Sequence, residues 1–163
     1  MASENQPTPN VIIYTDGAAK GNPGPGGYGI VMLSGQHRKE ISEGFAHTTN
    51  NRMELMGVIV ALETLKFKGS SVTVYSDSKY VIDSVEKRWV FGWEKSSFNK
   101  KKNPDLWIRF LKVFRQHSVK FIWIKGHANN KENERCDVLA VKASAGNNLK
   151  IDVGYSKEIE EED

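Results

Sequence analysis

Short apolar segments alternate with helical segments along much of this chain, and that alternation limits the fold more than any other feature. Residues 10–16, 71–77 and 119–124 are rich in β-branched residues, which is typical of buried strands. The segment after residue 48 instead places apolar residues at helical spacing, as at Leu55 and Ile59. Because helices that connect strands cross over the sheet, we expect the three strands to pair in parallel.

Two more strands are expected before the first long helix. Residues 27–34 and 38–47 have strand character, and the short turn between them favours antiparallel pairing. Helices are expected over residues 48–69, 78–87, 103–117 and 133–145, the first with Thr48, Thr49 or Asn50 as its N-cap and Gly69 as its stop. The pattern therefore predicts an α/β fold whose mixed sheet has an antiparallel hairpin at one edge.

The length of 163 residues suits one domain with one sizeable core. We expect residues 1–9 to be a loose lead-in, residues 10–146 to form a single domain, and residues 147–163 to be an acidic, disordered tail. The net charge is +3, but residues 152–163 hold six acids and one base, so the rest of the chain carries +8. A basic body suggests a polyanionic partner, although many basic proteins bind none.

The cellular compartment is indicated by what the sequence lacks. The single cysteine, Cys136, cannot form an intramolecular disulfide, which fits a reducing compartment, and we interpret it as a small packing residue. No apolar run approaches the roughly 20 residues that span a bilayer. The N-terminal residues show neither the basic start nor the apolar stretch of a secretory signal. We therefore expect a cytoplasmic protein without membrane contact.

Four acidic residues stand where the predicted fold could bring them together. Asp16 and Asp77 each end a strand, and sites in open α/β sheets form at the carboxyl ends of the strands. Glu54 lies near the start of the first long helix, and Asp137 lies one turn into the last helix. A cluster of carboxylates repels itself unless a cation neutralises it, and oxygen ligands favour Mg²⁺ or Mn²⁺. Each acid alone could equally be a turn residue, a helix-dipole partner or a solvated position.

A glycine-rich loop follows the first strand, and a histidine follows the last. Gly24, Gly26 and Gly29 satisfy G-x-G-x-x-G, but a strand follows them and Pro25 interrupts them, so we reject a dinucleotide site. The loop is either a tight turn or a bare backbone that can approach a sugar–phosphate chain closely. His127 is either an exposed loop residue or a proton shuttle at the sheet edge that carries the acids.

Five ordered motifs resemble the type 1 ribonucleases H of the bacterial kind. They are YTDGAAKGNPGPGGYG (14–29), TTNNRMELMGVIVALE (48–63), YSDSKYV (75–81), NPDLW (103–107) and IKGHANNKENERCDVLA (124–140). The resemblance covers residues 10 to 145. It implies a ribonuclease H-like fold, in which a five-stranded mixed sheet carries helices on both faces.

The resemblance also implies the activity. The family's activity is an endonuclease reaction that hydrolyses the RNA strand of RNA–DNA hybrids by a two-metal-ion mechanism and leaves 5′-phosphate and 3′-hydroxyl ends. The implied cofactor is Mg²⁺, with Mn²⁺ as a substitute and two ions per active site in the substrate complex. The implied partner is the hybrid duplex, and we expect a monomer.

The site residues implied by the resemblance fall into four groups. The metal ligands are Asp16, Glu54, Asp77 and Asp137, and the mobile catalytic histidine is His127. Contacts across the minor groove are implied for Asn22, Asn50 and Asn51. A pocket for a DNA-strand phosphate includes Thr49 and Asn103. A protrusion that grips the DNA strand includes Trp89 and Trp93 with the basic stretch after them, in which we single out Lys100, Lys101 and Lys102.

Three departures from the family pattern affect binding more than chemistry. The protrusion, residues 89–103, is several residues shorter than in the best-known bacterial members. Lys79 stands where a glutamine is common, and Val141 stands where a basic residue often lies near the phosphate pocket. The carboxylates are untouched by all three.

Two other functions compete with this interpretation. The first is another nuclease or strand-transfer enzyme of the same fold, such as a Holliday-junction resolvase or an integrase core. The glycine loop, the NNRMEL motif and the basic protrusion argue against it. The second is a non-catalytic module that binds hybrids, which the loss of any metal carboxylate would have favoured. All four carboxylates are present.

Overall fold

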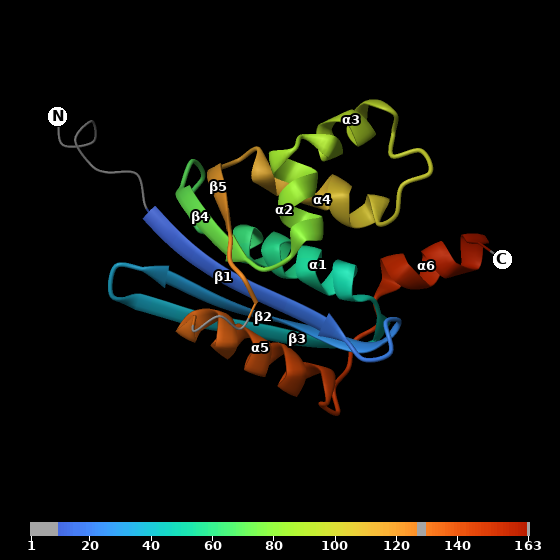
Figure 1. The fold of residues 1–163 in the computed structure, drawn as a ribbon, viewed down its shortest axis with the longest axis horizontal. Helices are drawn as coiled ribbons and strands as arrows, with labels where there is room; N and C mark the ends of the chain where they lie inside the picture. The colour runs from blue at the N-terminus through green and yellow to red at the C-terminus, as the bar shows by residue number, and fades with distance from the viewer. Residues whose placement is uncertain (1–9, 127–129, 163) are drawn as a thin grey trace.

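A computed structural model describes residues 10–126 and 130–162 of the chain. In chain order the elements are β1 (Asn10–Ala19), β2 (Gly24–Ser34), β3 (His37–Thr48), α1 (Asn50–Glu63), β4 (Ser71–Ser76), α2 (Lys79–Glu86), α3 (Trp89–Lys95), α4 (Pro104–Phe114), β5 (Ser118–Trp123), α5 (Lys131–Ser144) and α6 (Val153–Glu162) (Figure 1). None of the helices in the described ranges has the length and apolar character that crossing a membrane requires.

The five strands form one mixed sheet in the order β3-β2-β1-β4-β5. β1 pairs antiparallel with β2, and β2 pairs antiparallel with β3. β4 pairs parallel with both β1 and β5, as the crossover helices predict. The register places Tyr14 of β1 beside Tyr75 of β4, and their rings stack with centroids 4.8 Å apart. Asp16 and Asp77 each follow two residues later, so both carboxylates emerge at the same edge of the sheet.

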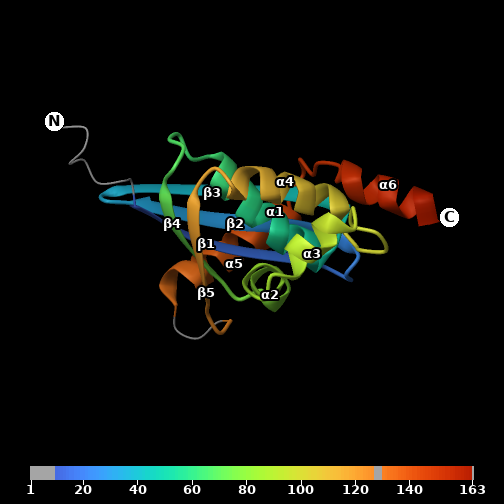
Figure 2. The same ribbon diagram turned by 90° about the horizontal axis from the view of Figure 1, so that it is seen from above.

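Helices cover both faces of the sheet, which confirms the layered architecture (Figures 1 and 2). α5 packs on one face against β1, β2 and β3, and α1 packs on the other face against β1 and β2. Gly29 lets α5 approach closely, since a Cβ at that position would lie 2.7 Å from the Cβ of Leu139. Cys136 on α5 is fully buried and donates to the Tyr14 carbonyl at 3.3 Å, so it is a packing residue as expected.

The main core lies between the sheet, α1 and α4. Ile13, Ile59 and Leu62 are fully buried there, and Trp107 and Phe110 of α4 pack edge-on at 5.4 Å between centroids.

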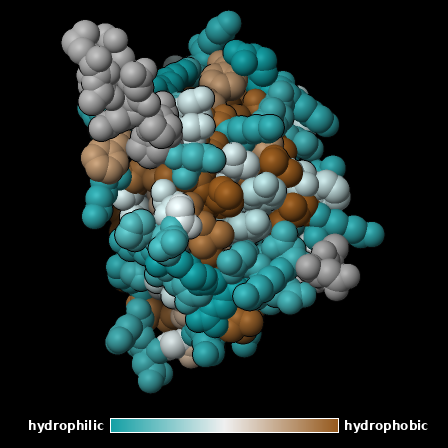
Figure 3. Space-filling model, turned by 90° about the vertical axis from the view of Figure 1, so that its left-hand side faces the viewer, coloured by the Kyte–Doolittle hydropathy of each residue, from teal (hydrophilic) through white to brown (hydrophobic). Residues whose placement is uncertain are grey.

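Apolar side chains also reach the surface at the end of the sheet where β1 begins (Figure 3). A groove at that end is lined partly by Val11, Met32, Leu33, Leu65 and Phe67. Because Asp16 lies toward the other end of β1, this groove is separate from the carboxylates.

The first long helix is shorter than its apolar pattern predicts. Thr49 is the N-cap, and its hydroxyl accepts a hydrogen bond from the Arg52 amide. α1 ends at Glu63, where Thr64 caps it and donates its hydroxyl to the Val60 carbonyl at 2.7 Å. Gly69, the expected stop, has a φ of +77° in the connection to β4. The apolar pattern continued into this connection because Leu65 still packs against the core.

The C-terminal segment differs most from expectation. Residues 147–163 were expected to be a disordered tail, whereas residues 153–162 form α6. The segment before α6 joins the domain, since Lys150 exchanges backbone hydrogen bonds with the residues beside Phe45 on β3. Asp152 is buried against Arg52. A buried guanidinium requires a counter-charge, and this acid supplies one from 100 residues away.

Candidate active site

Three of the predicted metal ligands meet at one point. Asp16, Glu54 and Asp77 each offer a carboxylate oxygen, and these oxygens lie within 4.8 Å of one another. β1 supplies Asp16, Asp77 directly follows β4, and the second turn of α1 supplies Glu54. Gly17 makes this approach possible because a Cβ there would lie only 2.6 Å from the Glu54 amide nitrogen. The end of β1 and the start of α1 are therefore in direct backbone contact.

Burial and mutual repulsion disfavour ionisation of this cluster. Burial, with the nearby Asp77 charge second, raises the pKa of Asp16 from 3.8 to about 7. Burial, followed by the charges of Asp16 and Asp77, raises the pKa of Glu54 well above its ordinary value. Without a cation, the cluster therefore retains a proton near neutral pH. A bound divalent cation would replace that proton.

The donor set fits a hard cation. All three candidate ligands are carboxylates, and hard cations such as Mg²⁺ and Mn²⁺ prefer carboxylate oxygens more strongly than softer metals do. Glu54 Oε2 is buried and has no hydrogen-bond partner among the described residues. A buried, unsatisfied carboxylate oxygen is costly, and a coordinated metal would satisfy it. The backbone at Gly126 also lies close to the cluster, since a Cβ at that position would lie 2.9 Å from Asp77 Oδ2.

The fourth predicted ligand stands at the wall of the same cavity. Asp137 on α5 lines a cavity of about 440 Å³ together with Asp16, Glu54 and Asp77. It is not part of the tight group of three, but its charge contributes to the raised pKa of Asp16. The predicted catalytic histidine, His127, lies outside the described residues.

A second cavity gathers the residues expected to contact nucleic acid. It measures about 320 Å³ and is lined by Asn22, Thr49, Asn51, Lys102, Asn103 and residues of α6. Asn51 also lines the carboxylate cavity, so the first turn of α1 joins the two. Asn50 lines only the carboxylate cavity, where its Oδ1 accepts from the Ala19 amide at 2.6 Å.

The Asn103 side chain is held from both of its ends. Its backbone is in the left-handed region, with φ at +62°, where asparagine is tolerated better than most residues. Its Oδ1 accepts from Arg52 Nη1 at 3.3 Å, and its Nδ2 donates to the Tyr80 hydroxyl at 3.0 Å. The Tyr80 hydroxyl also accepts from Trp107 Nε1 at 2.8 Å. Sequence reasoning missed Arg52 and Tyr80, because neither residue belongs to a recognisable ligand pattern.

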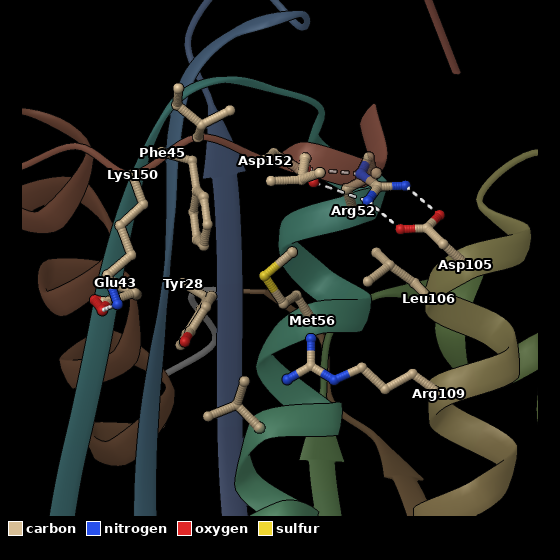
Figure 4. A pocket seen from close by; sticks show the side chains of 14 residues that line it. Tyr28, Glu43, Phe45, Arg52, Met56, Asp105, Leu106, Arg109, Lys150 and Asp152 are labelled. Atoms are coloured by element: carbon tan, nitrogen blue, oxygen red, sulfur yellow. Dashed lines mark hydrogen bonds and ion pairs between the residues drawn. The ribbon is translucent and has the colours of Figure 1, made fainter. Parts of the chain in front are cut away.

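An ion-pair network around Arg52 supports this region (Figure 4). Arg52 donates to both carboxylate oxygens of Asp105, at 2.9 and 2.7 Å, and to both of Asp152, at 2.7 and 2.8 Å. The Thr48 hydroxyl donates to Asp152 Oδ2 at 2.7 Å. The network closes one end of a cavity between the sheet, α1 and α4, and the side chains labelled in the figure, among them Tyr28, line this cavity.

The predicted protrusion separates into a packed part and an exposed part. Trp93 is half-buried and edge-on to Trp107, with centroids 5.9 Å apart, so it packs against the body of the domain. Trp89 is 47% exposed, and Lys87 Nζ lies 5.3 Å from its ring centroid. Lys101 Nζ lies 5.4 Å from the Trp93 ring centroid. All three lysines of the run 100–102 are exposed, as a phosphate-binding surface requires.

Sequence comparisons match most of the chain to one enzyme family. The RNase H family model matches residues 8–145. A ribonuclease H of Syntrophus aciditrophicus is 53% identical over 154 residues, which cover 91% of this chain and 88% of that relative. A ribonuclease H of Desulforamulus reducens is 54% identical, covering 93% and 98%. A ribonuclease HI of Synechocystis is 50% identical, covering 92% and 98%.

Comparisons with solved structures match the same family. LC9-RNase H1, described as a type 1 RNase H with the type 2 active-site motif, has a TM-score of 0.78 at 31% identity, covering 87% of this chain and 75% of that chain. LC11-RNase H1, solved in complex with an RNA/DNA hybrid, has a TM-score of 0.62 at 30% identity, covering 82% and 95%. These similarities agree with the five-stranded mixed sheet and its helices.

Proposed function

Because the chain belongs to the ribonuclease H family, and is thus an endonuclease that cuts the RNA strand of RNA–DNA hybrids, we propose that its acidic cluster binds Mg²⁺ for that reaction. The family assignment decides against the resolvase, integrase and non-catalytic interpretations that the motifs left open. The observation that carries the proposed metal site is the buried, unpartnered Glu54 Oε2 inside a group of three carboxylates.

The proposed ligands are Asp16, Glu54 and Asp77, with Asp137 joining them in the substrate complex. Two bound Mg²⁺ ions would supply an activated water for in-line attack and offset the charge on the leaving 3′-oxygen, and Mn²⁺ could substitute. Asp16 would serve both ions, because Asp77, Glu54 and Asp137 all act on its carboxylate. The carboxylates act as ligands and not as nucleophiles. His127 moves a proton to or from the reaction.

Choice of strand would come from the residues around the two cavities. Asn22, Asn50 and Asn51 meet the hybrid across the minor groove, where 2′-hydroxyls distinguish RNA from DNA. Thr49 and Asn103 bind a phosphate of the DNA strand. The partner strand must deform to reach that pocket, which favours a hybrid over duplex RNA.

The exposed part of the protrusion would grip the DNA strand. Trp89 and the run Lys100, Lys101 and Lys102 face solvent and contact the backbone of the hybrid. Trp93 supports them from within by packing on Trp107. We further propose that residues 10–146 act as a single catalytic domain, monomeric and cytoplasmic.

The test is cleavage of a hybrid whose RNA strand carries a label. With Mg²⁺, the RNA strand should be cut into products with 5′-phosphate ends, and the DNA strand and an all-RNA duplex should remain intact. The Glu54→Gln variant should be inactive, whereas Glu63→Gln on the same helix should cut normally. Cleavage that persists in a chelator, or an active Glu54→Gln variant, would contradict the metal site.

A further inference from the structure

The cavity proposed for the DNA-strand phosphate has a second set of lining residues, contributed by the C-terminal helix. One part of the lining consists of residues that the proposed function assigns to the hybrid, which are Asn22, Thr49, Asn51, Lys102 and Asn103. The rest consists of three side chains of α6, which are Tyr155, Glu158 and Ile159. Figure 1 shows α6 at the end of the molecule that also holds the β1–β2 turn and the start of α1. The C-terminal helix therefore lies where the DNA strand is expected.

The first turn of α6 is attached to the body of the domain. The Ser156 and Tyr155 amides donate to the Asp152 carbonyl at 3.0 Å and to the Asp152 carboxylate at 3.4 Å. The Tyr155 ring lies 5.4 Å from the His47 ring on β3, measured between centroids. Glu158 follows one turn later, so the attachment directs its carboxylate toward the cavity.

Glu158 brings a negative charge into a site proposed for a negative phosphate. Its carboxylate Oε1 lies 4.0 Å from Lys102 Nζ, and its side chain is 19% exposed against 71% for Lys102. Like charges within a few ångströms repel, and more strongly when they are partly shielded from water. A phosphate in the cavity would therefore be repelled by the Glu158 carboxylate beside it, and the two groups cannot share the cavity without an energetic cost.

The sequence after Glu158 adds to the same effect. Residues 160–163 are Glu-Glu-Glu-Asp, so the sequence after Glu158 is rich in negative charge. A nucleic-acid backbone carries the same kind of charge. This segment was expected to be an acidic, disordered tail, and the position of α6 changes that interpretation.

We propose that α6 is an autoinhibitory element in which Glu158 takes the place of a DNA-strand phosphate in the free enzyme. The proposal rests on the proposed function of the cavity. Hybrid binding then requires α6 to leave the cavity, and the helix lowers the affinity for nucleic acid without touching the carboxylate site.

The test compares Glu158→Gln with Glu63→Gln. Both changes remove one glutamate charge that is ion-paired in the wild-type protein, but Glu63 pairs with Arg109 at the far end of α1, roughly 18 Å along the helix from Asn51. Glu158→Gln should lower KM for the hybrid roughly threefold to tenfold at low salt. Its kcat should change little, because the carboxylate site is untouched. Glu63→Gln should match the wild type in both respects.

A direct measurement of hybrid binding tests the proposal independently of catalysis. Anisotropy of a labelled hybrid, measured in a chelator, should show tighter binding by Glu158→Gln even if the assignment of the metal site fails. Hydrogen exchange of the α6 amides should become faster when hybrid binds, since the helix is displaced. Equal or weaker binding by Glu158→Gln would overturn the proposal, and so would stronger protection of α6 in the complex.

Discussion

The buried pair between Arg52 and Asp152 should be worth several kcal/mol to the folded protein, and the variant Asp152→Asn tests this. The two side chains are only 1% and 2% exposed, so solvent screens their interaction little. The substitution keeps the shape but removes the charge, and it turns one oxygen into an amide NH₂. That group would face donors, since Arg52 and the Thr48 hydroxyl both donate to this carboxylate.

The magnitude follows from what remains after the change. Removing one partner of a buried ion pair typically costs about 3–5 kcal/mol, because the other charge is left uncompensated. Here Asp105 still pairs with Arg52 through two hydrogen bonds, at 2.9 and 2.7 Å. We therefore expect the lower end, about 3 kcal/mol. For a chain of this size, that corresponds to a drop in Tm of roughly 6–12 °C.

The assay is equilibrium unfolding in urea, followed by circular dichroism, with thermal melts as a second measurement. The matched control is Glu94→Gln, which removes a carboxylate of the same kind from an exposed pair with Arg115. The control should leave the urea midpoint unchanged. A loss below about 1 kcal/mol for Asp152→Asn, with an unchanged m-value, would refute the argument. It would mean that the desolvation of this pair offsets most of its attraction.

Three further predictions concern the reaction. Asp16→Asn should abolish cleavage in Mg²⁺ and yet stabilise the metal-free protein at neutral and higher pH; because the pKa of Asp16 is raised from 3.8 to about 7, the wild-type protein loses stability as pH rises from about 4 to about 7 and no further above that. Near-normal turnover, or a stability gain confined to acid pH, would contradict the assignment. His127→Ala should slow turnover by about 10²-fold or less, as for a proton shuttle that water can partly replace, and wild-type turnover at saturating hybrid would remove it from the mechanism. Changing Lys100, Lys101 and Lys102 together to alanine should raise KM and flatten its salt dependence by roughly one to three units of slope with little effect on kcat, and parallel slopes would show that the run does not meet phosphate.

The sheet and the carboxylates were predictable because local patterns determine them. A β-branched run that ends in an aspartate identifies both a buried strand and the edge at which its acid emerges. Parallel pairing of β1 with β4 then brings Asp16 and Asp77 level, as the register shows. Glu54 required one more step, the close backbone approach that Gly17 permits. That contact depends on the packing of α1 and cannot be inferred from spacing alone.

The structure of the C-terminal segment was not predictable, because no local pattern determines it. Its composition is that of a disordered chain, and the residue that orders it lies far away in sequence. Arg52 occupies the buried side of α1, where an arginine is uncommon and signals that a hidden acid must exist. The sequence offers many acids, and nothing local selects Asp152 or Asp105 among them. Only the three-dimensional arrangement identifies the partners and, through Asp152, the position of α6.

The first turn of α1 connects the two proposed sites mechanically. Asn51 lines both cavities, and Glu54 lies one turn further along the same rigid helix. Arg52 lies between them and bonds Asn103 on the far side of the phosphate cavity. On the proposed assignment, α1 therefore sets the distance between the scissile RNA phosphate and the bound DNA phosphate. The backbone of this helix cannot move at one site without moving at the other. On that assignment, the enzyme would select its substrate by the width of the minor groove, because a duplex of another width could satisfy one cavity only by leaving the other. Strand choice and hybrid choice would then follow from the packing of a single helix.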